Sequence, residues 1–255
     1  MRFLLYNMRY GAGAGALFNL PFPGFGYLRR NPRNLRRIVE FIRSRHPDIV
    51  GLVEIDGGSY LRSNRCCQAE LIAGELGHYH LYQGKYAPLA LANAIPLLSK
   101  QGNAILSRQE ISGNTFHYFD HGMKRLVIEA TTGNLTVFLV HLSLKFRHRQ
   151  HQLDALYELL RPVSGPCIVA GDFNVFWGDR ELRLFAAACD LLNANAEGLP
   201  SYPSRNPSRQ LDFIFHSRHL RTCHFEAPRI RLSDHCPLIC DFELNLRCRR
   251  KAVLT

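Results

Sequence analysis

Polar side chains lie beside several apolar runs whose composition is typical of buried strands. They are Asn7 after "FLLY", Glu54 after "DIVGLV", His141 after "LTVFLV", Asp172 and Asn174 after "CIVAG", Asp212 inside "QLDFIF", and Asp234 with His235 ahead of "PLIC". Asp172 and Asn174 are two residues apart, so both side chains project to the same face of an extended chain. Because burying an unpaired carboxylate is costly, we expect these groups to satisfy one another or to share a cation.

The residue types in this polar set indicate hydrolysis of phosphate esters. Glu54, Asp172, Asp234 and the amides of Asn7 and Asn174 are hard oxygen ligands of the kind that Mg²⁺ or Mn²⁺ prefers. The two histidines titrate near neutral pH and supply acid–base capacity. Such a site neutralises phosphate charge, activates water and protonates the leaving oxygen. The alternative for "GDFN" alone is a simple turn, since Gly, Asp and Asn are good turn residues.

The elements that must position these groups alternate between strands and helices. Strands are predicted at 2–6, 48–53, 102–107, 125–131, 135–142, 167–170, 210–216 and 237–244. Helices are predicted from Asn31, as N-cap ahead of Pro32, to Pro47, and over about 66–76, 148–161 and 179–189. A hairpin turn is predicted at Gly133-Asn134. Hairpins mixed with helical crossovers favour helices covering mixed sheets in one domain.

The composition is that of an ordinary globular protein, with 255 residues of which 46% are hydrophobic and 21% charged. The most apolar region, residues 11–28, is interrupted by Asn19 and two prolines, so no transmembrane segment is expected. The first residues, "MRFLLYN", include too few apolar residues for the hydrophobic core of a signal peptide. A cytoplasmic location is therefore the default expectation. Eight cysteines without a CxxC pair indicate buried free thiols rather than a zinc site or disulfides.

Seven stretches, taken in order, resemble the endonuclease/exonuclease/phosphatase superfamily. They are "YNMRYG", "DIVGLVEID", "GNAILSR", "FLVHLSL", "VAGDFNV", "YPSRNPSRQLDFIF" and "LSDHCPL". The resemblance runs from Asn7 to about Leu244 and implies a single catalytic domain over residues 1–255. It also implies an α/β fold, a four-layer α/β/β/α sandwich of two mixed β-sheets packed face to face with helices outside. Deoxyribonuclease-like nucleases, abasic-site endonucleases, neutral sphingomyelinases and inositol phosphatases share that fold.

The resemblance implies roles on the metal side of the site. Glu54 is the central Mg²⁺ ligand, supported by Asn7, with Mn²⁺ as the second choice of metal. Asp172 and Asn174 contact the attacking water, the phosphate or a metal. Asp234 is an orienting residue or a further metal ligand.

The resemblance implies acid–base and phosphate-binding roles as well. His235 is the general base, with the carboxylate of Asp234 beside it. His141, paired with Asp212, stabilises or protonates the phosphoryl group. Arg125, just before a strand that leads to His141, binds phosphate, although the resemblance is looser there.

Three hypotheses about function remain open at this point. The net charge of +11 favours a polyanionic partner and hence a nuclease acting on DNA or RNA. An insert at 11–30 carries aromatic residues beside Arg29 and Arg30. It favours contact with an anionic membrane through 16–30, and with it the same hydrolysis of a phospholipid head group or of another phosphorylated small molecule. The alternatives for the insert are stacking on bases, contact with a partner, or a covering loop. A basic tail follows at 246–255. A non-catalytic binding protein on the same fold is the third hypothesis, and the complete polar set argues against it.

Overall fold

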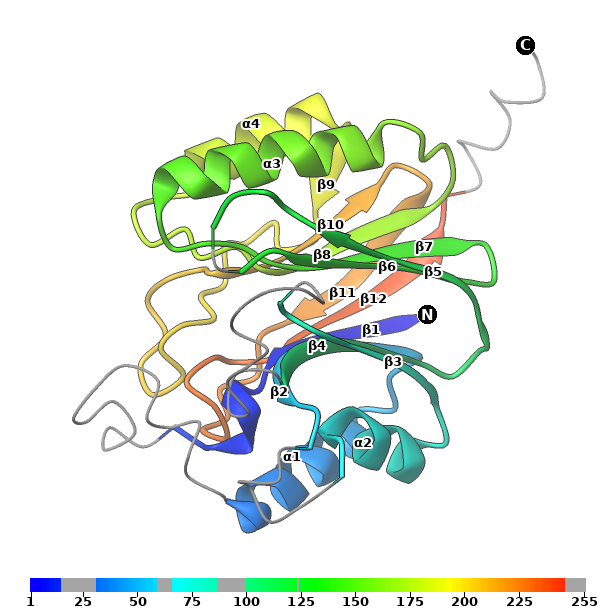
Figure 1. Cartoon of the computed structure of the whole chain (residues 1–255), viewed down its shortest axis with the longest axis vertical. Helices are drawn as coiled ribbons and strands as arrows, with labels where there is room; N and C mark the ends of the chain where they lie inside the picture. The colour runs from blue at the N-terminus through cyan, green and yellow to red at the C-terminus, as the bar shows by residue number, and fades with distance from the viewer. Residues whose placement is uncertain (15–30, 59–65, 87–99, 123, 246–255) are drawn as a thin grey trace.

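The computed structural model describes residues 1–14, 31–58, 66–86, 100–122 and 124–245. These residues form two six-stranded sheets that pack face to face, with helices on both outer faces (Figure 1). The four-layer sandwich that the resemblance implies is confirmed. The tail at 246–255, and the insert from residue 15 to residue 30, lie outside the described residues. None of the described helices has the length and apolar character needed to cross a bilayer.

The first sheet combines strands from the two ends of the chain. Across the sheet the order is β11 (Leu220–Glu226), β12 (Leu238–Leu244), β1 (Arg2–Asn7), β2 (Ile49–Asp56), β4 (Gln101–Ser107) and β3 (Tyr79–Gly84). β1 and β2 are parallel, and the other neighbouring pairs are antiparallel. Helices α1 (Pro32–Ser44) and α2 (Gln68–Leu76) cover its outer face (Figure 1).

The second sheet is built from one continuous part of the chain. Its order is β5 (Ile111–Tyr118), β6 (Leu126–Thr132), β7 (Leu135–His141), β8 (Cys167–Asp172), β10 (Asp212–Ser217) and β9 (Leu191–Asn193). β7 and β8 are parallel, and the remaining neighbours are antiparallel. Helices α3 (Phe146–Leu160) and α4 (Arg180–Ala188) lie on its outer face (Figure 1).

The first helix begins as its sequence predicts. The side chain of Asn31 accepts a hydrogen bond from the backbone N–H of Asn34 at 3.0 Å, and Pro32 takes the first helical position. Ile38 and Ile42 are fully buried in the cluster between α1 and the first sheet. The cap and the apolar face together dock α1 on the strands that carry Asn7 and Glu54.

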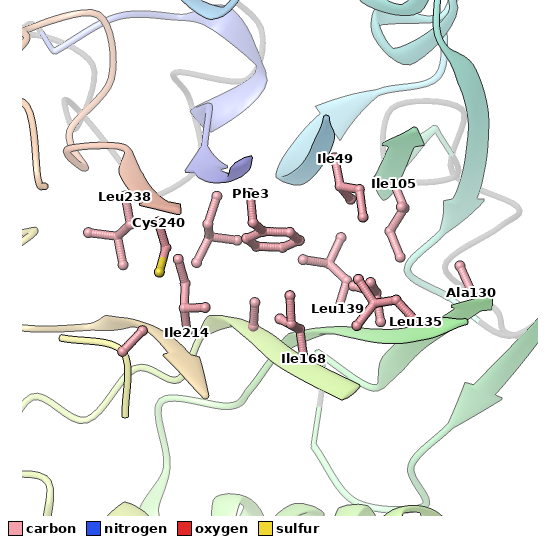
Figure 2. Close-up of a cluster of buried hydrophobic side chains, with 14 of the residues drawn as sticks. Phe3, Ile49, Ile105, Ala130, Leu135, Leu139, Ile168, Ile214, Leu238 and Cys240 are labelled. Carbon is pink, nitrogen blue, oxygen red and sulfur yellow. The ribbon is translucent and has the colours of Figure 1, made fainter. Parts of the chain in front are cut away.

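The core between the sheets holds both halves of the molecule as one body. Figure 2 shows Phe3 and Ile105 of the first sheet opposite Leu139 and Ile168 of the second. All four side chains are fully buried, and burying each stabilises the fold by about 1.5–3 kcal/mol. Residues from both sheets can therefore contribute to one rigid site.

Four strands of the structure are absent from the sequence prediction: β3, β5, β9 and β11. They occupy the four edges of the two sheets. The predicted interior strands and all four predicted helices are present, with ends shifted by a few residues.

Candidate active site

Strand register brings polar residues into one row across the second sheet. His141 at the end of β7 lies opposite Asp172 at the end of β8, because these strands are parallel. Asp212 at the start of β10 also lies opposite Asp172, because β8 and β10 are antiparallel. From the first sheet, Asn7 Nδ2 donates a hydrogen bond to Asp172 Oδ2 at 3.1 Å. The row therefore continues across the seam between the two sheets.

Asp172 is the centre of this cluster and is only 2% exposed. Its Oδ2 lies 3.1 Å from Asn7 Nδ2, 3.4 Å from His141 Nε2 and 3.9 Å from His235 Nε2. Its Oδ1 accepts a hydrogen bond from the backbone N–H of Asn174 at 3.0 Å. Burial opposes ionisation, but the contact with His141 and the surrounding positive charges hold the pKa of Asp172 well below its usual range. Asp172 is therefore ionised at neutral pH.

His235 is held in place by Asp212. Its Nδ1 lies 2.7 Å from Asp212 Oδ2, and that oxygen also accepts a hydrogen bond from Ser201 Oγ at 2.6 Å. The ring of Tyr202 packs on the imidazole, with centroids 5.0 Å apart. Burial alone would lower the pKa of His235, but the charge and hydrogen bond of Asp212, with the charge of Asp172, raise it to about 10. Without a metal ion His235 is therefore protonated at neutral pH, and its Nε2 is directed toward Asp172.

This pairing corrects the expected partnership between His141 and Asp212. β8 lies between β7 and β10, so these two residues are on opposite sides of Asp172. Asp234 is not the carboxylate bonded to His235 Nδ1 either. Its Oδ2 lies 3.5 Å from the guanidinium of Arg9.

On the other side of Asp172, His141 contacts a lysine and a glutamate. Its Nε2 is in hydrogen-bond contact with the Lys124 ammonium and lies 3.9 Å from Glu54 Oε1. Burial and the charge of Lys124 lower the pKa of His141, so its imidazole is neutral at neutral pH. Burial raises the pKa of Glu54, but the positive charges near it, that of Lys124 above all, outweigh this and lower it. Glu54 is therefore ionised.

Glu54 lies inside β2, not at its end, at an irregularity in the pairing with β4. The register shifts between Leu52 and Ile55, and Glu54 has a left-handed φ of 55°. Its backbone N–H donates to the side-chain oxygen of buried Asn103 at 3.2 Å. The bulge interrupts the regular alternation of side chains in β2, and Asn103 stabilises it.

Two other predicted contact residues have different surroundings from those expected. Asn174, also left-handed with φ of 54°, donates from Nδ2 to the carbonyl of Leu142 at 2.9 Å, so its amide supports the loop after β7. The carbonyl of Arg125 accepts a hydrogen bond from the backbone of Phe119 at 2.8 Å. Within the described ranges, no side-chain contact joins Arg125 to the cluster, and the neighbouring Lys124 occupies that position. Direct phosphate contacts by Asn174 and Arg125 stay predictions.

The site also depends on a buried arginine that the sequence analysis does not identify. Arg149 of α3 is 2% exposed and pairs with Glu181 of α4. Its guanidinium donates to the carbonyls of Ser143, Leu144 and Asn174 at 3.0–3.1 Å. Arg149 therefore ties the loop after β7 to the loop after β8, on which the site rests.

The oxygen donors of the cluster fit a divalent cation. From the described part of the chain, no group donates a hydrogen bond to the Glu54 carboxylate, and both the Lys124 ammonium and the His141 imidazole are 3.9 Å from its Oε1. Asp172, Asp212 and His235 present ligand atoms within 4.8 Å of one another, and all three are buried. Since carboxylate oxygens suit Mg²⁺ and Mn²⁺, Glu54 and Asp172 are the residues that would hold such an ion. The amide of Asn7 presents Nδ2 to Asp172, and its Oδ1 accepts a hydrogen bond from the backbone N–H of Arg9, so its role as a metal ligand stays a prediction.

Replacing Asn103 by alanine is expected to destabilise the protein by about 1–3 kcal/mol, because the backbone N–H of Glu54 loses its acceptor at the bulge. The free energy of unfolding from urea denaturation measures this. Asn114→Ala on β5, an exposed position, is the control and should stay within about 0.5 kcal/mol of the wild type. Equal stability of the two variants would show that Asn103 does not support the bulge.

The pH dependence of stability tests the pairing of His235 with Asp212. The raised pKa of His235 stabilises the folded state fully below the ordinary histidine value of 6.5, and this contribution is lost as pH rises through about 10. The stability difference between wild type and His235→Gln, measured by urea denaturation in chelator, should therefore shrink between pH 7 and 10. A difference that stays constant over this range would contradict the pairing.

The sequence of this chain is similar to those of a known protein family. The chain matches the sequence model of the endonuclease/exonuclease/phosphatase family over residues 4–235. It is 30% identical over 177 residues to the uncharacterized protein YbhP of Escherichia coli strain K12. That alignment covers 60% of this chain and 66% of YbhP, so the chain spans slightly less than two thirds of this relative.

Solved structures of low sequence identity share the fold. The endonuclease/exonuclease/phosphatase from Beutenbergia cavernae superposes with a TM-score of 0.74 at 20% identity, covering 96% of this chain and 72% of that one. The mannosyl-6-phosphatase Bt3783 of Bacteroides thetaiotaomicron gives a TM-score of 0.70 at 16% identity, covering 96% and 100%. With a family match that spans nearly the whole chain, this protein belongs to the endonuclease/exonuclease/phosphatase family, whose members hydrolyse phosphate esters.

Proposed function

We propose that this protein hydrolyses phosphodiester bonds of nucleic acids in a reaction that depends on Mg²⁺ or Mn²⁺. The observation that carries the proposal is the arrangement of His235, whose Nδ1 is bonded to Asp212 while Nε2 faces Asp172. An imidazole fixed at one nitrogen and directed into a cluster of oxygen donors is suited to take a proton from an attacking water. A cation bound by Glu54 and Asp172 would neutralise the charge on the phosphate.

The side chains proposed to act in the reaction lie on two sides of Asp172. In the metal-free protein the charges of Asp212 and Asp172 keep His235 protonated at neutral pH, and a cation held by Glu54 and Asp172 would offset the charge of Asp172 and lower the pKa of His235. On this first side of the site, Nε2 of His235 would then accept the proton of water, and Asp212 would stabilise the imidazolium through Nδ1. On the other side, His141 and the Lys124 ammonium face the position where charge develops on the phosphoryl oxygens. Asp172 orients both imidazoles by its negative charge.

The charge of the molecule supports a polyanionic substrate. The net charge is +11, and Arg205 and Arg209 are exposed on the segment that also carries Ser201 and Tyr202. Phosphate contacts by arginine favour association with nucleic acid, and their effect falls with salt concentration. A phosphorylated small molecule is the second candidate substrate, favoured by the likeness in fold to the mannosyl-6-phosphatase. A phospholipid head group is the third, and the insert that favours it lies outside the described residues.

A single substrate panel tests the proposal. Single- and double-stranded DNA, abasic duplex, RNA, sphingomyelin-containing vesicles and sugar phosphates are incubated with Mg²⁺, Mn²⁺ or chelator. Cleavage of a nucleic acid that needs metal and is lost in His235→Ala is the expected result, and that variant also controls for contaminating nuclease. Turnover of vesicle lipid or sugar phosphate alone would contradict the nucleic-acid assignment. No turnover of any ester would contradict the phosphoesterase assignment.

A further inference from the structure

A series of ring contacts leads from the candidate site to the surface. The ring of Tyr202 packs on His235 at 5.0 Å, and Phe176 meets Tyr202 edge-on at 5.7 Å. Trp177 then contacts Phe176, with centroids 6.1 Å apart. The inner rings are buried or half-buried, whereas Trp177 is 84% exposed. The series therefore ends in an indole that is open to solvent.

The position of Trp177 is tied to the site by a short, bonded loop. Trp177 follows Asn174 by three residues, so their Cα atoms are at most about 11 Å apart. The carbonyl of Asn174 accepts hydrogen bonds from Arg149 and from the backbone N–H of Phe176, both at 3.1 Å. The backbone N–H of Gly178 closes the turn on the carbonyl of Val175 at 3.4 Å. The indole is therefore presented near the site by a braced loop.

A cation lies next to this aromatic series. The guanidinium of Arg209 is 5.5 Å from the centre of the Phe176 ring, and Arg209 is itself exposed. Proteins bind single-stranded nucleic acid with this combination, in which aromatic rings stack on bases and cations follow the phosphates. We propose that Trp177 stacks on a base of a single-stranded nucleic acid substrate, with Arg209 beside the backbone. This inference rests on the proposed function and names the form of substrate.

Fluorescence tests the inference directly, because Trp177 is the only tryptophan in the sequence. Wild-type protein in chelator is titrated with an oligodeoxythymidylate and, in parallel, with an abasic phosphodiester oligomer of equal length and charge. Stacking predicts quenching by the base-bearing oligomer and little quenching by the abasic one. Trp177→Ala should weaken binding of a labelled oligodeoxythymidylate by about 5- to 150-fold, with most of the affinity retained in Trp177→Phe.

Leu184→Ala is the matched control, because Leu184 is another large apolar side chain, 67% exposed on α4. Its affinity for the oligodeoxythymidylate should equal that of the wild type. Equal quenching by the two oligomers would overturn base stacking. A blue shift with anionic vesicles, without quenching by either oligomer, would also overturn it and make Trp177 a membrane contact.

Cleavage of the abasic oligomer with Mg²⁺ tests the proposed function separately, because this substrate has no bases to stack. Cleavage of this oligomer without quenching by the base-bearing one would reject the inference and leave the proposed function standing. Base-dependent quenching without cleavage of either oligomer would support stacking and reject the hydrolytic function.

Discussion

Replacing His235 by alanine is expected to lower kcat/KM for phosphodiester hydrolysis by about 10²- to 10⁴-fold, the usual contribution of a positioned general base. The reason is that Nε2 of His235 is directed at Asp172 while Nδ1 is bonded to Asp212, so that Nε2 is the nitrogen that would take the proton of water once a bound cation offsets the charge of Asp172. The rate with a nucleic acid substrate under saturating metal measures this effect. His80→Ala, an exposed histidine on β3, is the control and should not change the rate. A rate near that of the wild type in His235→Ala would reject His235 as the base.

Combining variants separates the observed pairing from the expected one. Asp212→Asn alone should slow the reaction less than His235→Ala, and adding it to His235→Ala should change little, because both act through one imidazole. Adding Asp212→Asn to His141→Ala should slow the reaction further, since β8 lies between these residues. The opposite result would be that Asp212→Asn slows the His235→Ala variant further but leaves the His141→Ala variant unchanged. That result would show that Asp212 acts through His141.

Replacing Gly171 by alanine is expected to destabilise the protein by at least about 3 kcal/mol. Gly171 pairs with Val140 across β7 and β8, and a Cβ atom at Gly171 would lie 1.9 Å from the Val140 carbonyl oxygen. Because that oxygen belongs to the backbone, the two strands would have to separate. Asp172 follows directly, so the variant should also lose activity.

Urea denaturation measures this loss, and Gly74→Ala provides the control. Gly74 lies inside α2, and a Cβ atom there has no neighbour within 4 Å. That variant should gain about 0.5–1 kcal/mol, the helix preference of alanine over glycine. Stability of Gly171→Ala close to that of the wild type would show that β7 and β8 can adjust around a methyl group.

The sequence predicts the interior of both sheets but not their edges, for a physical reason. Interior strands such as β8 are buried on both faces and read as continuous apolar runs. β5 and β11 consist mostly of exposed and half-buried positions and carry many polar residues, so neither contains such a run. An edge strand forms largely because it hydrogen-bonds to a neighbouring strand. The local sequence of the edge strand does not show which strand that neighbour is.

Some residues of the candidate site could likewise be predicted from sequence, and others could not. Asp172, His141 and Asn7 could be placed from sequence because each ends an apolar run. The partner of Asp212 could not, because it depends on the order of strands in the sheet. Lys124 could not be distinguished from its neighbour Arg125, because both lie in the loop ahead of β6 and the sequence does not show which of the two side chains faces the site.

The first and last strands of the described chain are neighbours. Arg2 to Leu5 pair with Asp241 to Leu238, and His235 lies just ahead of β12. During synthesis on the ribosome, the edge of β1 that pairs with β12 stays unpaired until β12 has been made. The nascent chain thus acquires its general-base candidate just before β12. If nucleic acid is the substrate, a growing chain has not yet assembled the site that would cleave the messenger beside it.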